Sequence, residues 1–141
     1  MILNPITITS DFGLRDFYSA AVHGRLLKLQ PDLNIIVVSH LIQQYNVFQA
    51  SVVVQNTWKH FPDGTVNMVL VNGNQGKQLR QVAVKYKGHY FVGPDSGLHS
   101  LIFDEKPEVI IQLNNEDNSF ETFPELTICT KAAVHLAEGK D

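Results

Sequence analysis

The sequence predicts an α/β fold, a three-layer sandwich with a largely parallel, partly mixed central sheet flanked by helices. Short runs of β-branched residues alternate with segments of helical periodicity between residues 6 and 71, which is the order of parallel βαβ units. Two later runs, 81–86 and 89–92, alternate in the strand manner around Lys87-Gly88, which predicts an antiparallel hairpin. The sheet is therefore expected to be parallel at its start and mixed later.

The first strand is expected at Ile6–Thr9, because all four residues are β-branched. A helix is expected between Phe17 and Pro31, with Asp16 at its N-cap. Its apolar face is predicted from the i, i+3, i+4, i+7 spacing of Phe17, Ala20, Ala21, Gly24 and Leu27. The continuous apolar run 34–40 is typical of a strand covered on both faces.

A second helix is predicted over 46–60, and its apolar residues spread so widely around the axis that burial on most sides is expected. The remaining elements are expected in this order: a turn at 61–64, a strand at 65–71, a polar loop at 72–78, the hairpin, a tight loop at 93–97, a short helix or strand at 98–103, a strand at 109–113, a loop at 114–119 and a helix at 128–139.

Length and composition indicate one domain, residues 1–141. The net charge of −3 and the lack of a basic cluster argue against a nucleic-acid partner. The longest apolar runs are far shorter than the ~20 residues that a membrane helix needs. A single cysteine, Cys129, excludes an intramolecular disulfide, and the first residues lack a basic segment followed by an apolar run, so a cytoplasmic location is expected.

Several motifs fail on spacing. Gly73 and Gly76 in VNGNQGKQLR are too close together for a phosphate-binding loop, so a turn is the simpler interpretation. Asp95 rather than Ser96 is central in GPDSG, which is not the spacing of a serine-hydrolase elbow. The six histidines show no paired metal spacing, so most of them are expected on the surface or in helices and no metal site is expected.

Asp11 follows the first strand at its carboxyl end, where open α/β sheets place their ligands. Tyr45 lies in the loop after the second strand and would meet Asp11 at the same edge if the strands are parallel. One interpretation is structural: Asp11 forms an Asx turn and Asp16 caps a helix. The other is a nucleoside site, in which the acid binds sugar hydroxyls and the aromatic ring lies against a base.

The order of five motifs adds a resemblance. These motifs are S-D-F-G-x-x-D, V-V-S-H before an aromatic loop, F-P-D-G-T-V, Y-F-V-G-P-D-S-G-L, and T-F-P followed by A-A-V-H-L-A-E-G. Over about residues 5–139 the chain resembles the N-terminal domain of the S-adenosylmethionine (SAM) hydroxide adenosyltransferases, relatives of the fluorinating and chlorinating enzymes.

The resemblance implies a reaction without metal or cofactor, in which water or hydroxide displaces methionine from C5′ of SAM and gives adenosine. It also implies that Asp11 binds the ribose hydroxyls, that Asp16 lies near the methionine end and that Tyr45 lies against the nucleoside. Full-length family members carry a C-terminal β-rich domain, which is not recognised in this chain. They form trimers that hold adenine between subunits, so a homotrimer is expected for a longer parent chain.

The positions that the family uses to activate water hold Asn72, Leu79 and Pro124, and Arg80 stands one residue from the family arginine. Asn72 is also expected to line the substrate site. Because neither asparagine nor proline can take a proton as a carboxylate does, impaired turnover is expected. Three functions stay open: an impaired SAM hydrolase, a protein that binds SAM or adenosine without cleaving it, and an isolated domain fragment.

Overall fold

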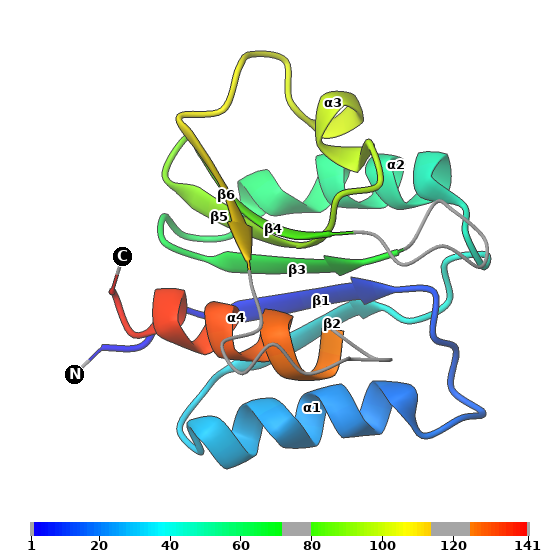
Figure 1. Ribbon diagram of the computed structural model, residues 1–141, viewed down its shortest axis with the longest axis vertical. Coiled ribbons are helices and arrows are strands. Elements are labelled where there is room, and N and C mark those ends of the chain that lie inside the picture. Colours follow the sequence, from blue (N-terminus) through cyan, green and yellow to red (C-terminus); the bar gives the residue numbers. More distant parts are fainter. Residues whose placement is uncertain (1, 72–79, 114–124, 141) are drawn as a thin grey trace.

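The computed structural model describes residues 2–71, 80–113 and 125–140. In these ranges the chain forms a six-stranded sheet between two layers of helices (Figure 1). The strands are β1 (Ile6–Ser10), β2 (Ile35–Ser39), β3 (Val66–Leu70), β4 (Gln81–Tyr86), β5 (His89–Pro94) and β6 (Val109–Leu113). Their order across the sheet is β2-β1-β3-β5-β4-β6. The predicted α/β fold is confirmed.

The sheet combines a parallel part with an antiparallel part, as predicted. β1 pairs in parallel with β2 and β3, and β3 pairs in parallel with β5. β4 is antiparallel to both β5 and β6. The carboxyl ends of β1, β2, β3 and β5 therefore meet at one edge of the sheet.

The strand predicted over 34–40 is present as β2, but the expectation that both its faces are covered is wrong. β2 lies at the edge of the sheet, and Val37 at its centre is 43% exposed. β1 and β3 are instead buried along their whole length. A short apolar run has the same composition in a central strand and in an edge strand, because position in the sheet depends on the rest of the fold.

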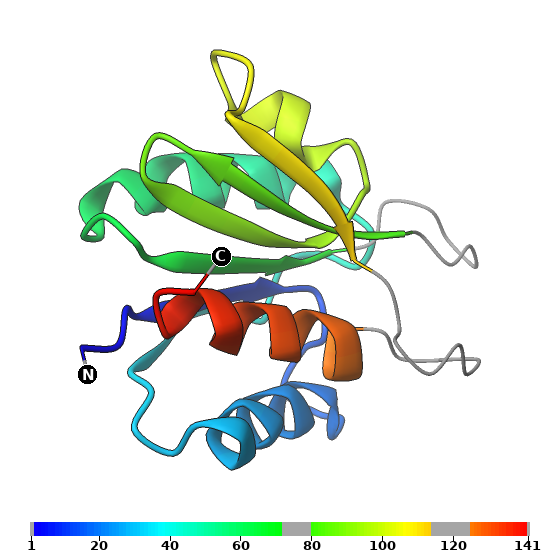
Figure 2. The ribbon, with the colours of Figure 1, turned by 60° about the vertical axis from the view of Figure 1, so that its left-hand side comes forward.

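The helices cover the two faces of the sheet in pairs (Figures 1 and 2). On one face lie α1 (Tyr18–Leu29) and α4 (Thr130–Ala137), and on the other lie α2 (Val47–Thr57) and α3 (Leu98–Ile102). A 3₁₀ turn, Trp58–His60, extends α2, and a π-helical turn, Glu125–Cys129, leads into α4. Each layer has its own apolar core, with Val22, Leu26 and Ala133 on the first face and Val54, Trp58 and Leu98 on the second.

The helix predicted between Phe17 and Pro31 is present, but its cap and its buried face were predicted wrongly. α1 begins at Tyr18, with Phe17 in the N-cap position, so Asp16 does not cap it. Val22 and Leu26 face the core, whereas Leu27 on the predicted face is 38% exposed. The predicted face lies beside the edge strand, where it lines a shallow groove with Ser19, Ala20, His23, Gly24, Leu27, Val37 and His40.

α2 begins at an asparagine cap, because the side chain of Asn46 accepts a hydrogen bond of 2.9 Å from the Gln49 N–H. Only one face of the helix is buried, by Ala50, Ser51 and Val54. Phe48 and Val52 are 70% and 44% exposed, so the predicted burial on most sides is wrong.

The hairpin between β4 and β5 is confirmed, and Lys87 and Gly88 both have positive φ angles, of 48° and 80°. Two consecutive positive φ angles are typical of a tight hairpin turn. Further along β5, a Cβ atom on Gly93 would lie 2.0 Å from the carbonyl oxygen of Val69 in β3. Glycine is therefore required where these two strands approach each other.

The predicted loops at 72–78 and 114–119 lie outside the described residues. None of the helices in the described ranges has the length and apolar character that a membrane crossing needs.

Candidate functional site

Asp11 and Tyr45 lie together at the edge of the sheet where the carboxyl ends of the parallel strands meet, as the sequence predicts. Asp11 directly follows β1, and its Oδ2 accepts a hydrogen bond of 2.9 Å from the backbone N–H of Tyr45. The bond joins residues 34 positions apart, so the carboxylate connects two loops, whereas the structural interpretation expected a local Asx turn. The Asp11 side chain is part-buried at this edge.

Both loops have unusual backbone conformations at this point. Tyr45 has a φ angle of 63°, and Gly13 in the other loop has a φ angle of 74°. The left-handed conformation costs an L-residue such as tyrosine roughly 1–2 kcal/mol. Backbone bonds stabilise the arrangement, because the Gly13 N–H donates to the His40 carbonyl at 2.8 Å and the Asn46 N–H donates to the Gln43 carbonyl at 2.9 Å.

The environment of Asp11 disfavours its charge. Burial raises the pKa of the carboxyl above its ordinary value, while the N–H of Tyr45 and its own N–H act in the opposite direction. A carboxylate has about four acceptor positions, and the N–H groups of Tyr45 and of Asp11 itself use two of them. A ligand with a pair of hydroxyl groups would supply donors for the others and would compensate the burial of the charge.

The structure does not bring Asp16 into contact with Asp11. Asp16 is exposed, and among the described residues it has no hydrogen bond or ion pair. Arg80 precedes β4, where its Nε lies 2.7 Å from Oδ2 of Asp95, in an ion pair whose arginine side chain is 61% exposed. The other predicted site residues, Asn72, Leu79 and Pro124, lie outside the described residues.

Sequence reasoning missed a buried polar pair behind Asp11. Ser10 Oγ lies 2.5 Å from Nδ1 of His40, and the ring of Phe12 stacks on the His40 ring at 6.4 Å. His40 is 6% exposed, and His89 in β5 is 3% exposed, so these two are exceptions to the expectation that most histidines lie on the surface or in helices. The available signal was that Ser10 ends β1 and that His40 directly follows β2, the parallel neighbour of β1.

Large apolar side chains close in sequence to Asp11 and Tyr45 are exposed. Leu14 and Phe17 follow Asp11 in the chain, and Leu41 and Phe48 flank Tyr45; their exposed fractions are 69%, 65%, 66% and 70%. Exposed apolar side chains are typical of a binding surface where they form one patch.

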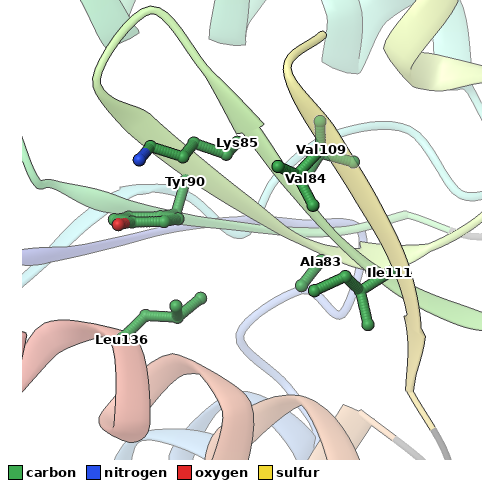
Figure 3. A pocket seen from close by; sticks show the side chains of 7 residues that line it. All are labelled: Ala83, Val84, Lys85, Tyr90, Val109, Ile111 and Leu136. Carbon is green, nitrogen blue, oxygen red and sulfur yellow. The ribbon is translucent and has the colours of Figure 1, made fainter. Parts of the chain in front are cut away.

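A separate cavity of about 250 Å³ lies between α4 and the strands β4, β5 and β6 (Figure 3). Its lining residues are Ala83, Val84, Lys85, Tyr90, Val109, Ile111 and Leu136. Lys85 and Tyr90 supply its polar groups, and none of the described residues that line it is a carboxylic acid or a histidine. Among its described lining residues the cavity offers no carboxylate that could accept from a pair of ribose hydroxyls, so the Asp11 edge is the candidate functional site.

Fold and site together define an α/β protein with a candidate ligand site at the carboxyl ends of parallel strands, formed by a half-buried acid and an aromatic loop. The chain belongs to the SAM hydroxide adenosyltransferase family, because the profile of the SAM hydroxide adenosyltransferase N-terminal domain matches residues 6–141. The resemblance inferred from the sequence motifs is confirmed.

Relatives agree with this assignment. The chain is 32% identical over 109 residues to the (R)-S-adenosyl-L-methionine hydrolase of Methanocaldococcus jannaschii, covering 74% of this chain and 41% of that protein. It is 30% identical to the (R)-S-adenosyl-L-methionine hydrolase of Thermus thermophilus, covering 97% and 58%. An uncharacterized conserved protein from Thermotoga maritima has the same fold, with a TM-score of 0.87 at 28% identity, covering 96% and 55%. The chain spans about half the length of these relatives.

Proposed function

We propose that this chain binds the adenosyl group of SAM and takes part in its cleavage by water to adenosine and methionine. The observation that carries the proposal is the contact between Asp11 and the Tyr45 loop at the carboxyl end of β1, in a chain of this family. Relatives of about 30% identity that are named (R)-S-adenosyl-L-methionine hydrolases support the choice of substrate.

In this proposal the Asp11 carboxylate accepts hydrogen bonds from the two ribose hydroxyls, which add to the bond from the Tyr45 N–H and lower the cost of burying the charge. The Tyr45 ring lies against the adenine. Asp16, an exposed acid three residues beyond Gly13, attracts the ammonium group of the methionine part.

The proposed reaction is a displacement at C5′. The oxygen of water attacks C5′ opposite the sulfur, the C–O bond forms as the C–S bond breaks, and the electron pair of that bond goes to sulfur. Methionine leaves as a neutral thioether, so the leaving group needs no acid, and the proton lost from water goes to a base or to solvent. Catalysis then depends on alignment of the nucleophile and on exclusion of other water.

We propose that turnover is slow. Asn72, Leu79 and Pro124 stand where the family resemblance expects the water-activating acid, arginine and histidine. A group that assists proton transfer contributes roughly 10²–10⁴ in rate. The ion pair with Asp95 engages Arg80, which weakens the case for Arg80 as a substitute.

We further propose that a second protein surface closes the site, as in a homotrimer of a longer parent chain in the cytoplasm. The exposure of four apolar residues close in sequence to Asp11 and Tyr45, namely Leu14, Phe17, Leu41 and Phe48, supports this. The chain also spans only about half the length of its relatives.

Calorimetric titration of SAM and of adenosine into the chain, followed by chromatography of the same samples, tests the proposal. We expect binding of both ligands and slow appearance of adenosine and methionine. Asp11→Ala should abolish binding, whereas Asp32→Ala, which removes an exposed acid in the turn before β2, should leave it unchanged. Binding without product would favour a receptor that does not cleave SAM. Unchanged affinity in Asp11→Ala would disprove the ribose assignment.

A further inference from the structure

Ser10 and His40 form a buried polar pair at the ends of two neighbouring strands. Ser10 is 0% exposed and His40 is 6% exposed. The register of β1 and β2 shifts by one residue, from Ile8 opposite Val37 to Thr9 opposite Ser39. This shift brings Ser10 beside His40, with 2.5 Å between Oγ and Nδ1.

The direction of the hydrogen bond follows from the partners of the serine. The Phe12 N–H donates to Ser10 Oγ at 3.3 Å, so that contact uses an acceptor position of the hydroxyl. A buried hydroxyl also needs an acceptor for its own proton. Among the described residues, the acceptor within reach is His40 Nδ1, so Ser10 donates to a neutral imidazole that carries its proton on Nε2. Burial lowers the pKa of His40, and His23 adds to the shift, which agrees with a neutral ring.

Backbone hydrogen bonds connect the same two loops, and each loop supplies one donor and one acceptor. The Ile42 N–H donates to the Ser10 carbonyl at 3.3 Å, and the Gly13 N–H donates to the His40 carbonyl at 2.8 Å. The Tyr45 N–H then reaches Asp11 at 2.9 Å, with the backbone of Tyr45 in its unfavourable left-handed conformation. The Ser10–His40 bond lies in the interior beside these contacts, where it fixes the residues from which both loops start.

We propose that Ser10 and His40 are positioning residues that hold Asp11 and the Tyr45 loop in the arrangement that binds the ligand. This inference rests on the proposed function. Neither residue acts as a nucleophile or a base in it, since Ser10 is fully buried and its hydroxyl proton is already donated. Their effect on the ligand passes through Asp11, the next residue after Ser10, and through the loop that follows His40.

Four variants test the inference: Ser10→Ala, His40→Ala, His40→Asn and His23→Ala. Asparagine can place its amide oxygen where Nδ1 of histidine lies, so His40→Asn retains an acceptor for the serine. His23→Ala is the control, because His23 lines the same groove as His40 but lies on α1. Thermal unfolding of each variant checks that it is folded.

In titrations with adenosine, Ser10→Ala and His40→Ala should each weaken binding about tenfold, as expected for loss of one buried hydrogen bond. His40→Asn should recover most of the affinity, and His23→Ala should bind as the unchanged chain does. If folded Ser10→Ala and His40→Ala bind adenosine normally while Asp11→Ala does not, the positioning role is wrong and the proposed function stands.

Two measurements without ligand separate the two proposals. Amide hydrogen exchange at Gly13 and Tyr45 should accelerate in Ser10→Ala, while exchange at Met68 in the buried strand β3 stays slow. Nitrogen NMR of the unchanged chain should show His40 neutral at pH 7 with its proton on Nε2. Unaltered exchange at Gly13 and Tyr45, or a proton on Nδ1, would overturn the positioning role even if adenosine binds. Absence of adenosine binding to the unchanged chain would overturn the proposed function, and the exchange rates would still decide whether the pair holds the two loops.

Discussion

The substitution Gly93→Ala tests the close approach of β5 to β3. The added Cβ atom would lie 2.0 Å from the carbonyl oxygen of Val69, whereas ordinary contact begins at 3.4 Å, so the oxygen has to retreat by about 1.4 Å. Both strands have a neighbouring strand on each side and cannot move apart freely, so this movement strains the hydrogen bonds between β3 and β5. We expect a loss of about 3 kcal/mol in the free energy of unfolding, at the upper end for overpacked interiors. For a chain of this size that corresponds to a fall of about 10 °C in melting temperature.

The assay is thermal unfolding followed by circular dichroism, with urea unfolding as a second measurement. Gly24→Ala is the matched control, because a Cβ atom on this exposed residue of α1 would meet no atom within 4 Å. It should stabilise the chain by up to about 1 kcal/mol, since alanine favours a helix more than glycine does. If Gly93→Ala melted at the temperature of the unchanged chain, the proposed contact would be refuted.

Three further predictions concern charge and capping. Asp11→Asn should raise the melting temperature at pH 7 and abolish adenosine binding. Because the pKa of Asp11 is raised in the folded chain, its contribution to stability belongs to the protonated form and is lost as pH rises through the folded pKa. Asparagine is neutral at every pH, and its side-chain oxygen can still accept the hydrogen bond from the Tyr45 N–H. Burial lowers the pKa of His89, while Asp63 opposes the shift. The contribution of neutral His89 to the free energy of unfolding should therefore be fully present above pH 6.5, its ordinary pKa, and should be lost as pH falls from that value to the folded pKa. Urea unfolding at several pH values should show a smaller loss for His89→Phe. Asn46→Ala removes the cap of α2 and should cost about 1 kcal/mol in urea unfolding.

The buried strands and the hairpin could be predicted from the sequence because local chemistry decides them. β1 is rich in β-branched residues, and Lys87-Gly88 suits a turn with two positive φ angles. The meeting of Asp11 with the Tyr45 loop could also be predicted, because neighbouring parallel strands bring their carboxyl ends to one edge.

Other features depend on tertiary structure that no local pattern contains. α1 has two apolar stripes, and only the edge position of β2 decides that Val22 and Leu26 face the core while Leu27 lines a groove. The Ser10–His40 bond depends on a one-residue shift in strand register, which composition does not reveal.

The place of β2 at the edge of the sheet gives the two sides of the site unequal local stability. Asp11 extends from β1, a central strand with every residue buried. The Tyr45 loop extends from β2, which among the described strands pairs with β1 alone and has partly exposed side chains. Edge elements open at a lower free energy than the strands of a buried core. Local fraying would therefore release the aromatic side of the site first and leave the acid in place, so we expect a bound nucleoside to exchange through brief openings of β2, without unfolding of the domain.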